Sequence, residues 1–430
     1  MAAPPLLFLL LLLGISPAPS SSSLLGINYG LVANNLPPPE AVVPLVRSIG
    51  ASRVKIYDAD PTVLHAFSGT GVEFVVGLAD ECVARVCDPN EALTWVKANI
   101  LPFASRTKIS AVTVGNEVLT RNNTALAQKL LPAMQSIRSA LAAVGLDKQV
   151  VVTTAHSFAI LEKSYPPSAG TFRRDLAPYI RDILGFLAQT GAPFLINAYP
   201  YFAYKDDPKG ISLEYVLFQP NAGVVDPASG LRYDNMLHAQ VDAVHTAIKG
   251  LMGKDKEVEV RVSETGWPSC GDPDEAGATV ENARKYNANL LQLVGQKKGT
   301  PLKPDSVLQV YVFALFNENQ KPGPTSERNY GLFKPDGSPV YQLGVTVPNG
   351  NGGGSGSGGG SSSGGGSGSG TNGGGSGQGG GDSSTYSPGY YSISSATKVG
   401  LRPGCGAPAG FSLLLQQAAA WLLGRLFFSR

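Results

Sequence analysis

Eight short apolar runs, separated by longer segments with helical spacing, constrain the fold of this chain between Leu24 and Val347. Their apolar residues are nearly continuous, as expected of parallel strands that helices cover on the outside. The runs are LLGINYG from Leu24, ASRVKIYD from Ala51, VEFVVGLA from Val72, ISAVTVGNEV from Ile109, QVVVTTAHSF from Gln149, FLINAYPYF from Phe194, EVEVRVSETGWP from Glu257 and SVLQVYVFALFNE from Ser306. We therefore predict an α/β fold in which residues 24–347 form one (β/α)8 TIM barrel, with an open doubly wound sheet as the alternative.

The intervening segments include two clear helical patterns. One is PNEALTWVKANILPFA from Pro89 and the other is LRYDNMLHAQVDAVHTAIKGLM from Leu231. Both have apolar residues at the spacing of one helix face. We expect each to lie on the outside of the barrel.

Polar and aromatic residues gather at the C-terminal ends of the apolar runs. They are Asn28 and Tyr29, Tyr57 and Asp58, Asn116 and Glu117, Tyr199 with Tyr201 and Phe202, Glu264 and Trp267, and Asn317 and Glu318. A single polar strand end is ordinary turn chemistry. The same clustering at six strand ends instead indicates a functional face, because a parallel barrel carries its catalytic groups at the C-terminal ends of its strands.

Two glutamates at these ends, Glu117 and Glu264, fit the hydrolysis of a glycosidic bond. One carboxylic acid protonates the departing oxygen, and one carboxylate attacks or stabilises the anomeric carbon. Most glutamates are solvated surface charges. Each of these two, however, follows an apolar strand, AVTVGN before Glu117 and VRVS before Glu264.

Other chemistries lack their sequence signatures. The chain has a formal charge of +2 with no polybasic run, so we expect no nucleic-acid partner. It contains neither H-E-x-x-H nor a phosphate-binding G-x-x-x-x-G-K-[ST]. None of its four histidines stands in a nucleophile motif, although His156 follows a strand and could contact substrate.

The four cysteines do not have zinc-site spacing, and we predict no metal. Cys82 and Cys87 could close a short local disulfide, and free buried thiols are an equal alternative. Cys270 has no obvious partner in the sequence.

Several motifs make residues 24–347 resemble the plant endo-1,3-β-glucosidases of glycoside hydrolase family 17. In order they are GINYG, NNLP, KIYDADP, VGNEV, LPAMQSIRSAL, INAYPYFAY, SETGWPS and FNENQKPG. The resemblance implies a (β/α)8 barrel, endo-hydrolysis of a β-1,3-glucan such as callose, and no cofactor. It assigns Glu117 as proton donor and Glu264 as nucleophile of a retaining mechanism.

The resemblance also implies a set of residues around these two glutamates. Charged neighbours of the nucleophile are Glu318, Lys321 and Glu327, and aromatic residues of the cleft are Tyr57 and Tyr199. We complete the predicted substrate-binding set with three residues from the polar strand ends, Asn116, Phe202 and Trp267. Arg261 departs from the family pattern, and an inward arginine there would be costly unless it is paired.

The two ends of the chain predict secretion and lipid anchoring. Residues 1–23 have the apolar core and small residues of a cleaved signal peptide, the alternative being a membrane-spanning helix. Residues 348–395 form a Gly/Ser-rich segment that we expect to be a disordered linker. Residues 396–430 resemble a glycosylphosphatidylinositol attachment signal, the alternative being an amphipathic helix packed on the barrel. Asn122 begins the sequon NNT and is a candidate glycan site.

We accordingly expect a monomer that acts on β-1,3-glucan at the extracellular face of the plasma membrane and in the cell wall. Two rival functions remain. The first is a β-1,3-glucan transglycosylase, which uses the same two glutamates. The second is a non-catalytic cell-wall glucan binder, which the presence of both glutamates disfavours.

Overall fold

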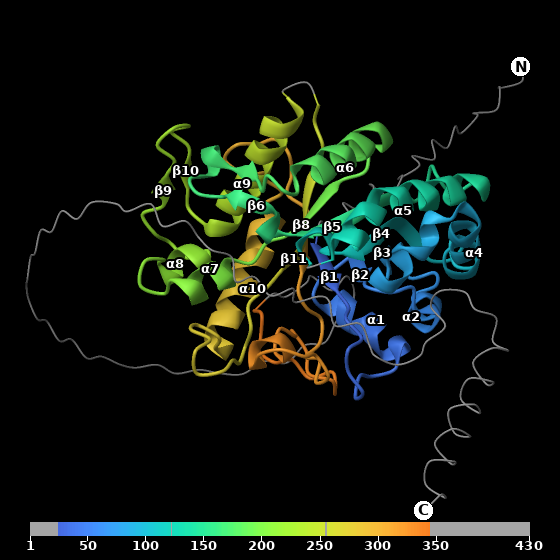
Figure 1. Cartoon of the computed structure of the whole chain (residues 1–430). Coiled ribbons are helices and arrows are strands. Elements are labelled where there is room, and N and C mark those ends of the chain that lie inside the picture. Colours follow the sequence, from blue (N-terminus) through green and yellow to red (C-terminus); the bar gives the residue numbers. More distant parts are fainter. Residues whose placement is uncertain (1–24, 122, 254–255, 345–430) are drawn as a thin grey trace, which may run out of the picture.

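Eight parallel strands close into a barrel in the computed structural model, which describes residues 25–121, 123–253 and 256–344 (Figure 1). The order around the barrel is β1-β12-β11-β8-β5-β4-β3-β2. The strands are β1 (Leu25–Asn28), β2 (Arg53–Ile56), β3 (Glu73–Leu78), β4 (Lys108–Asn116), β5 (Val151–Ser157), β8 (Phe194–Asn197), β11 (Val260–Thr265) and β12 (Val310–Val312). Each predicted run supplies one strand, so the barrel prediction is confirmed and the open sheet is wrong.

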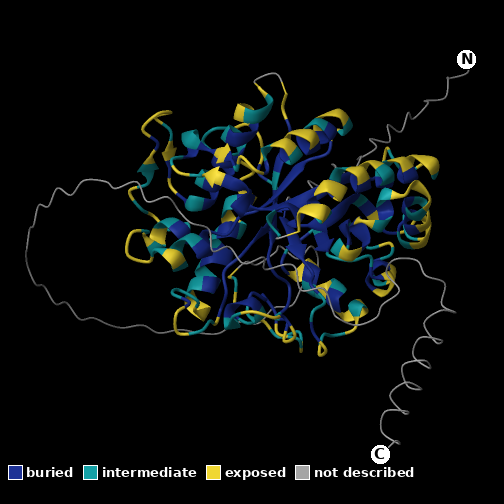
Figure 2. Ribbon diagram, in the orientation of Figure 1, coloured by how far each residue is buried: buried dark blue, intermediate teal, exposed yellow. Residues whose placement is uncertain are grey.

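Helices cover the outside of this barrel (Figure 1). The longer ones are α1 (Pro39–Ser48), α4 (Pro89–Asn99), α5 (Thr124–Ala143), α6 (Ala177–Thr190), α9 (Met236–Met252) and α10 (Val280–Gly295). The shorter helices are α2 (Pro61–Ala66), α3 (Asp80–Val83), α7 (Pro200–Asp206) and α8 (Leu213–Val216). Two antiparallel pairs, β6 (Leu161–Lys163) with β7 (Thr171–Phe172) and β9 (Val224–Val225) with β10 (Arg232–Tyr233), extend the connections after β5 and β8. The helices expose one face and bury the other against the strands (Figure 2).

Two helical predictions differ from the structure in detail. The helix predicted from Leu231 begins at Met236, because Asn235 caps it by accepting a hydrogen bond from the His238 amide at 2.9 Å. No α-helix follows β12 within the described part of the chain, so the last β-then-α unit lacks its helix. That connection instead carries a 3₁₀ turn, η5 (Thr325–Arg328), and a bridge between Phe316 and Phe333.

The barrel interior is polar at the N-terminal ends of its strands. Glu73 lies 2.9 Å from Lys108 and 3.6 Å from Arg53. Arg261, which departs from the family pattern, makes two hydrogen bonds of 2.8 Å to Glu259. This pairing offsets the cost of placing an arginine in a barrel strand.

A small apolar cluster lies further along the strands, where Val75 and Ala111 pack with Tyr311. Gly26 belongs to this level, because a Cβ atom there would lie only 2.2 Å from the Tyr311 ring. The neighbouring residues of the same strands, such as Val76, belong to the large core under the helices. This alternation is the two-residue period of a strand with one face toward the barrel axis.

Several predicted features lie outside the described residues. These are the signal peptide (1–23), the Gly/Ser linker (348–395), the attachment signal (396–430) and the glycan site Asn122. Among the helices that are described, none is long and apolar enough to cross a membrane. Cys87 carries a free thiol, so the local disulfide between Cys82 and Cys87 is wrong.

Candidate active site

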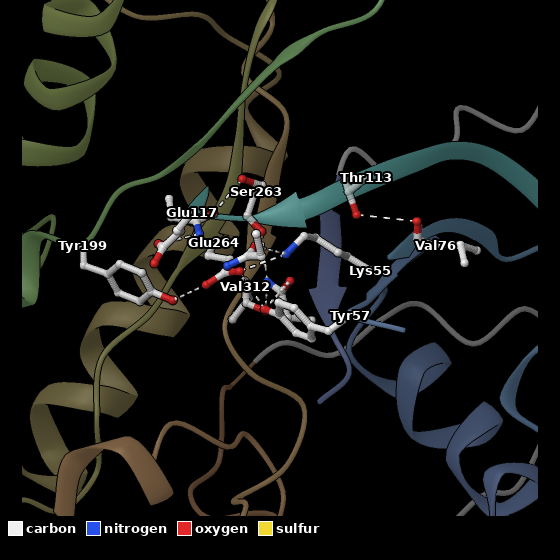
Figure 3. A network of polar contacts seen from close by, with 12 residues as sticks. Lys55, Tyr57, Val76, Thr113, Glu117, Tyr199, Ser263, Glu264 and Val312 are labelled. Atoms are coloured by element: carbon white, nitrogen blue, oxygen red, sulfur yellow. Dashed lines mark hydrogen bonds and ion pairs between the residues drawn. The ribbon is translucent and has the colours of Figure 1, made fainter. Parts of the chain in front are cut away.

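Glu264, near the C-terminal end of β11, is completely buried and accepts three hydrogen bonds through its carboxylate. Lys55 Nζ donates to Oε1 at 2.8 Å and the Tyr57 hydroxyl to the same oxygen at 2.7 Å. The Tyr199 hydroxyl donates to Oε2 at 3.0 Å. The carboxylate therefore lies between Tyr199 on one side and Lys55 with Tyr57 on the other (Figure 3).

Burial and the charge of Glu264 act on the protons of these three partners. Burial lowers the pKa of the Lys55 ammonium, and the Glu264 carboxylate beside it opposes that shift. Burial, together with the negative charge of Glu264, raises the pKa of Tyr57 and of Tyr199 well above the usual value. Both phenols consequently keep their protons and act as donors. A carboxylate with two neutral donors and an ammonium around it is suited to act as a nucleophile.

Glu117 follows β4, on the same face of the barrel. Its Oε1 accepts a hydrogen bond of 2.8 Å from Asn197 Nδ2, at the end of β8. The Asn197 Oδ1 atom in turn accepts from the Ser263 hydroxyl at 2.7 Å, which orients the amide so that its NH2 group faces Glu117. Ser263 directly precedes Glu264, so this chain of hydrogen bonds joins the two glutamates.

The two glutamates therefore have different surroundings. Glu264 contacts the Lys55 ammonium, and Glu117 accepts a hydrogen bond from the Asn197 amide. Hydrolysis of a glycosidic bond uses one carboxyl group as general acid and a second as nucleophile. The arrangement can protonate a departing oxygen with Glu117 and attack the sugar with Glu264.

Lys55 and Asn197 are functional residues that the sequence predictions did not include. Both lie inside quoted motifs, KIYDADP and INAYPYFAY. A signal for Lys55 is present: Arg53, Lys55 and Tyr57 alternate with Val54 and Ile56 in a strand that should be apolar on both faces. Charged residues at that period indicate a polar barrel interior.

Glu318 and Lys321 lie on the connection after β12. Their charges act on the partners of Glu264, Lys321 on Lys55 and Glu318 on Tyr57. Lys321 Nζ is 3.4 Å from Glu318 Oε2 and 4.1 Å from the centre of the Phe313 ring. The other carboxylate oxygen of Glu318 accepts from the Val32 amide at 2.7 Å. Gly30 lets the β1 connection approach, because a Cβ atom there would lie 2.4 Å from the Glu318 oxygens.

Glu327 lies on η5, which two carboxylates fasten to the connection after β11. Asp272 accepts from the Thr325 amide at 2.9 Å and from its hydroxyl at 2.5 Å. Glu275 likewise accepts from the Ser326 amide at 3.0 Å and from the Ser326 hydroxyl. These contacts place Glu327 where the Glu117 and Glu264 carboxylates act on it electrostatically.

Burial raises the pKa of Glu327 to about 7. The Lys321 ammonium opposes this shift, whereas the negative charges of Glu117, Glu275 and Glu264 add to it. Glu327 therefore holds a proton over much of the acidic range in which an exposed glutamate is ionised.

Three further residues of the predicted substrate-binding set are Asn116, Phe202 and Trp267, and their surroundings differ from one another. Asn116 Oδ1 lies 3.5 Å from Lys55 Nζ. Phe202 packs against the Tyr199 ring at 5.4 Å and has an ammonium, Lys205, 5.6 Å from its centre. Trp267 is fully buried, with its indole NH donating to the Gly277 carbonyl at 2.8 Å and its ring against Tyr201. That position makes Trp267 a packing residue under the site.

His156 packs on Phe194, a residue of the large core under the helices. It is buried, and its ring stacks on Phe194 with 4.6 Å between the ring centres. Burial lowers its pKa to about 3, so the imidazole is neutral. The expectation that His156 could contact substrate is therefore wrong.

The proton on Glu327 predicts a pH-dependent stability. Between pH 4.5 and about 7 the folded chain binds a proton at Glu327 that the unfolded chain does not, so stability falls as pH rises through this window. Glu327→Gln removes this dependence. Urea unfolding at pH 4.5, 6 and 8 measures the free energy of unfolding. As pH rises, the value for the wild type is expected to fall relative to that for the variant, by about 1–3 kcal/mol in total. Glu81→Gln, at an exposed position of α3, is the control. Parallel curves for the wild type and Glu327→Gln would contradict the assignment.

Comparison with known proteins finds clear relatives of this chain. Residues 25–345 match glycosyl hydrolases family 17. The chain is 57% identical over 350 residues to an Arabidopsis thaliana protein named glucan endo-1,3-beta-glucosidase 10, covering 81% of this chain and 82% of that protein. It is 53% identical over 391 residues to glucan endo-1,3-beta-glucosidase 11 of the same plant, covering 90% and 91%.

A solved structure is also similar. It is described as a beta-1,3-glucanase and allergen of Cryptomeria japonica pollen, with 40% sequence identity and a TM-score of 0.70. The match covers 74% of this chain and 98% of that one. The family match spans the whole barrel, including both glutamates and their hydrogen-bond partners. The chain therefore belongs to glycoside hydrolase family 17.

Proposed function

We propose that the protein hydrolyses internal β-1,3-glucosidic linkages of a β-1,3-glucan such as callose, with retention of configuration. The observation that carries this proposal is the pair of glutamates at the C-terminal ends of barrel strands, joined by a chain of hydrogen bonds. Glu264 accepts from Lys55, Tyr57 and Tyr199. Glu117 accepts from Asn197, whose amide is oriented by Ser263. The names of the relatives, glucan endo-1,3-beta-glucosidases at 57% and 53% identity, support the choice of substrate.

The reaction takes two steps on these residues. In the first step, the Glu117 carboxyl protonates the glycosidic oxygen, and a Glu264 oxygen attacks the anomeric carbon. The bond to the leaving sugar breaks and a glycosyl ester forms on Glu264. In the second step, the Glu117 carboxylate takes a proton from a water molecule, whose oxygen attacks the same carbon and releases Glu264.

The donors around Glu264 serve both steps. They hold the attacking oxygen in one orientation, and they stabilise the carboxylate again when the ester is cleaved. Lys55 and Tyr57 both bond to Oε1, and Tyr199 bonds to Oε2. No step requires a cofactor.

This proposal predicts a specific pattern of activity. The wild type is expected to cut β-1,3-glucan into shorter oligosaccharides and to be less active on mixed-linkage glucan. Glu264→Gln keeps the shape of the side chain but removes the nucleophile, so kcat is expected to fall by about 10³-fold or more. Product chain lengths and reducing ends are the measurements, and Glu281→Gln on the exposed face of α10 is the control.

Other outcomes of this assay would support the rival functions. Products longer than the starting oligosaccharide would show transfer to a second glucan chain, the transglycosylase reaction. Retention of glucan by a wild type that releases no products would show a non-catalytic binder. Undiminished turnover by Glu264→Gln would contradict the assignment of the nucleophile.

We further propose that the enzyme is secreted and held at the extracellular face of the plasma membrane as a monomer. The support comes from the sequence alone: the apolar leader of residues 1–23, the Gly/Ser-rich residues 348–395 and the attachment-like residues 396–430. A linker of roughly forty residues of this composition would reach about 35 Å toward the wall. We also propose a glycan on Asn122, which a mass decrease after peptide N-glycosidase treatment would test.

The anchor proposal predicts release by a lipid-specific enzyme. Phosphatidylinositol-specific phospholipase C is expected to release active protein from membranes of expressing plant cells, because the lipid is the only attachment. A matched chain that ends at Gly381 is expected to be secreted freely with the same specific activity. A full-length protein that resists the phospholipase yet partitions with detergent would favour a retained hydrophobic helix. A freely soluble full-length protein would rule out the anchor.

A further inference from the structure

The backbone that presents Glu117 is held in an unusual conformation. The pairing of β4 with β5 shifts register between Thr113 and Asn116, so β4 contains a bulge. Gly115, in the bulge, has φ +65°, and Glu117 has φ 56° and ψ 27°. A left-handed glutamate is disfavoured by its Cβ atom, so neighbouring groups must hold it in place.

Asp80 and Arg121 hold the residue before Glu117 on both sides. Asp80 Oδ1 accepts a hydrogen bond of 2.8 Å from the Asn116 amide. Arg121 Nη2 donates to the Asn116 carbonyl at 3.3 Å and lies 2.5 Å from Asp80 Oδ2. The ion pair thus clamps the amide and the carbonyl of one residue, Asn116.

The next backbone groups are fixed as well. The Glu117 amide donates to the Ala155 carbonyl at 2.8 Å, and its carbonyl accepts from the Thr120 amide at 3.1 Å. The Glu117 backbone is therefore anchored to β5 and to the turn that follows Glu117 in the sequence. The Asp80–Arg121 pair fixes the backbone on the N-terminal side of Glu117, through the amide and the carbonyl of Asn116.

The pair is poorly explained as a device for stability alone. Its side chains are only 13% and 27% exposed, and the desolvation cost of a pair this buried can offset the attraction between its charges. Both members meet at the backbone next to the predicted proton donor. We propose that Asp80 and Arg121 are positioning residues that aim the Glu117 carboxyl at the glycosidic oxygen.

This inference rests on the proposed function. It predicts different losses on two kinds of substrate, whereas a general loss of stability would slow both equally. Aiming a proton donor matters only when the leaving group needs a proton. A sugar leaving group needs one, whereas dinitrophenolate departs without one. Loss of the clamp should therefore slow cleavage of glucan and leave cleavage of a dinitrophenyl β-1,3-glucobioside nearly unchanged.

The test compares kcat/KM on these two substrates, because kcat/KM reports the steps up to formation of the glycosyl-enzyme. For Asp80→Ala we expect a decrease of about 10- to 100-fold on β-1,3-glucan, the size expected for a misplaced general acid, and less than about threefold on the aryl glycoside. Asp80→Asn retains an oxygen acceptor for the Asn116 amide and is expected to recover most of the activity on glucan. Glu117→Ala should show the same preference for the aryl substrate in a stronger form.

The control is Glu281→Ala, which breaks an exposed ion pair with Arg284 on α10, far along the chain from the donor. It is expected to change neither rate. Equal losses on both substrates for Asp80→Ala, or an unchanged rate on glucan, would overturn the proposal, and Asp80→Asn provides the same comparison if Asp80→Ala fails to fold. A wild type that cleaves neither substrate would instead contradict the proposed function.

Discussion

The ion pair between Lys55 and Glu264 is the interaction on which the active site depends. Both side chains are almost without exposed surface, 1% and 0%, and their atoms are 2.8 Å apart. Burying two charges is costly even when they pair, so the site needs additional donors. Tyr57 and Tyr199 supply them. Removing any one of these partners would leave a buried charge incompletely compensated.

The barrel brings these partners together from separate parts of the chain. Lys55 comes from β2 and Glu264 from β11, and β1 and β12 lie between these strands in the sheet. Asn197 at the end of β8 connects the nucleophile side to Glu117 after β4. Parallel strands make this possible because all of their C-terminal ends open on one face. The connections after β11 and β12 then complete the site by fixing Glu327 close to Glu117 and Glu264.

The sequence was sufficient to predict the barrel and its catalytic face, because both depend on local patterns. Continuous apolar runs indicate parallel strands, and polar residues at their ends indicate the open face. Contacts between distant segments leave no such local signal. The hydrogen bonds of Glu275 to Ser326, 51 residues away, could not be read from either segment alone. Trp267 has the same difficulty, because a tryptophan near a strand end gives no indication of whether it faces a sugar or packs below the site.

The central claim is that Glu264, oriented by its three hydrogen-bond donors, forms the covalent bond to the sugar. A 2-fluoro β-1,3-glucobioside with a good leaving group tests it directly, since the fluorine slows hydrolysis of the glycosyl-enzyme and lets it accumulate. Mass spectrometry of the digested enzyme is predicted to show one fluorinated disaccharide per chain, attached to the peptide that contains Glu264. A label on any other residue, or turnover without a covalent adduct and with inverted configuration of the product, would contradict the account.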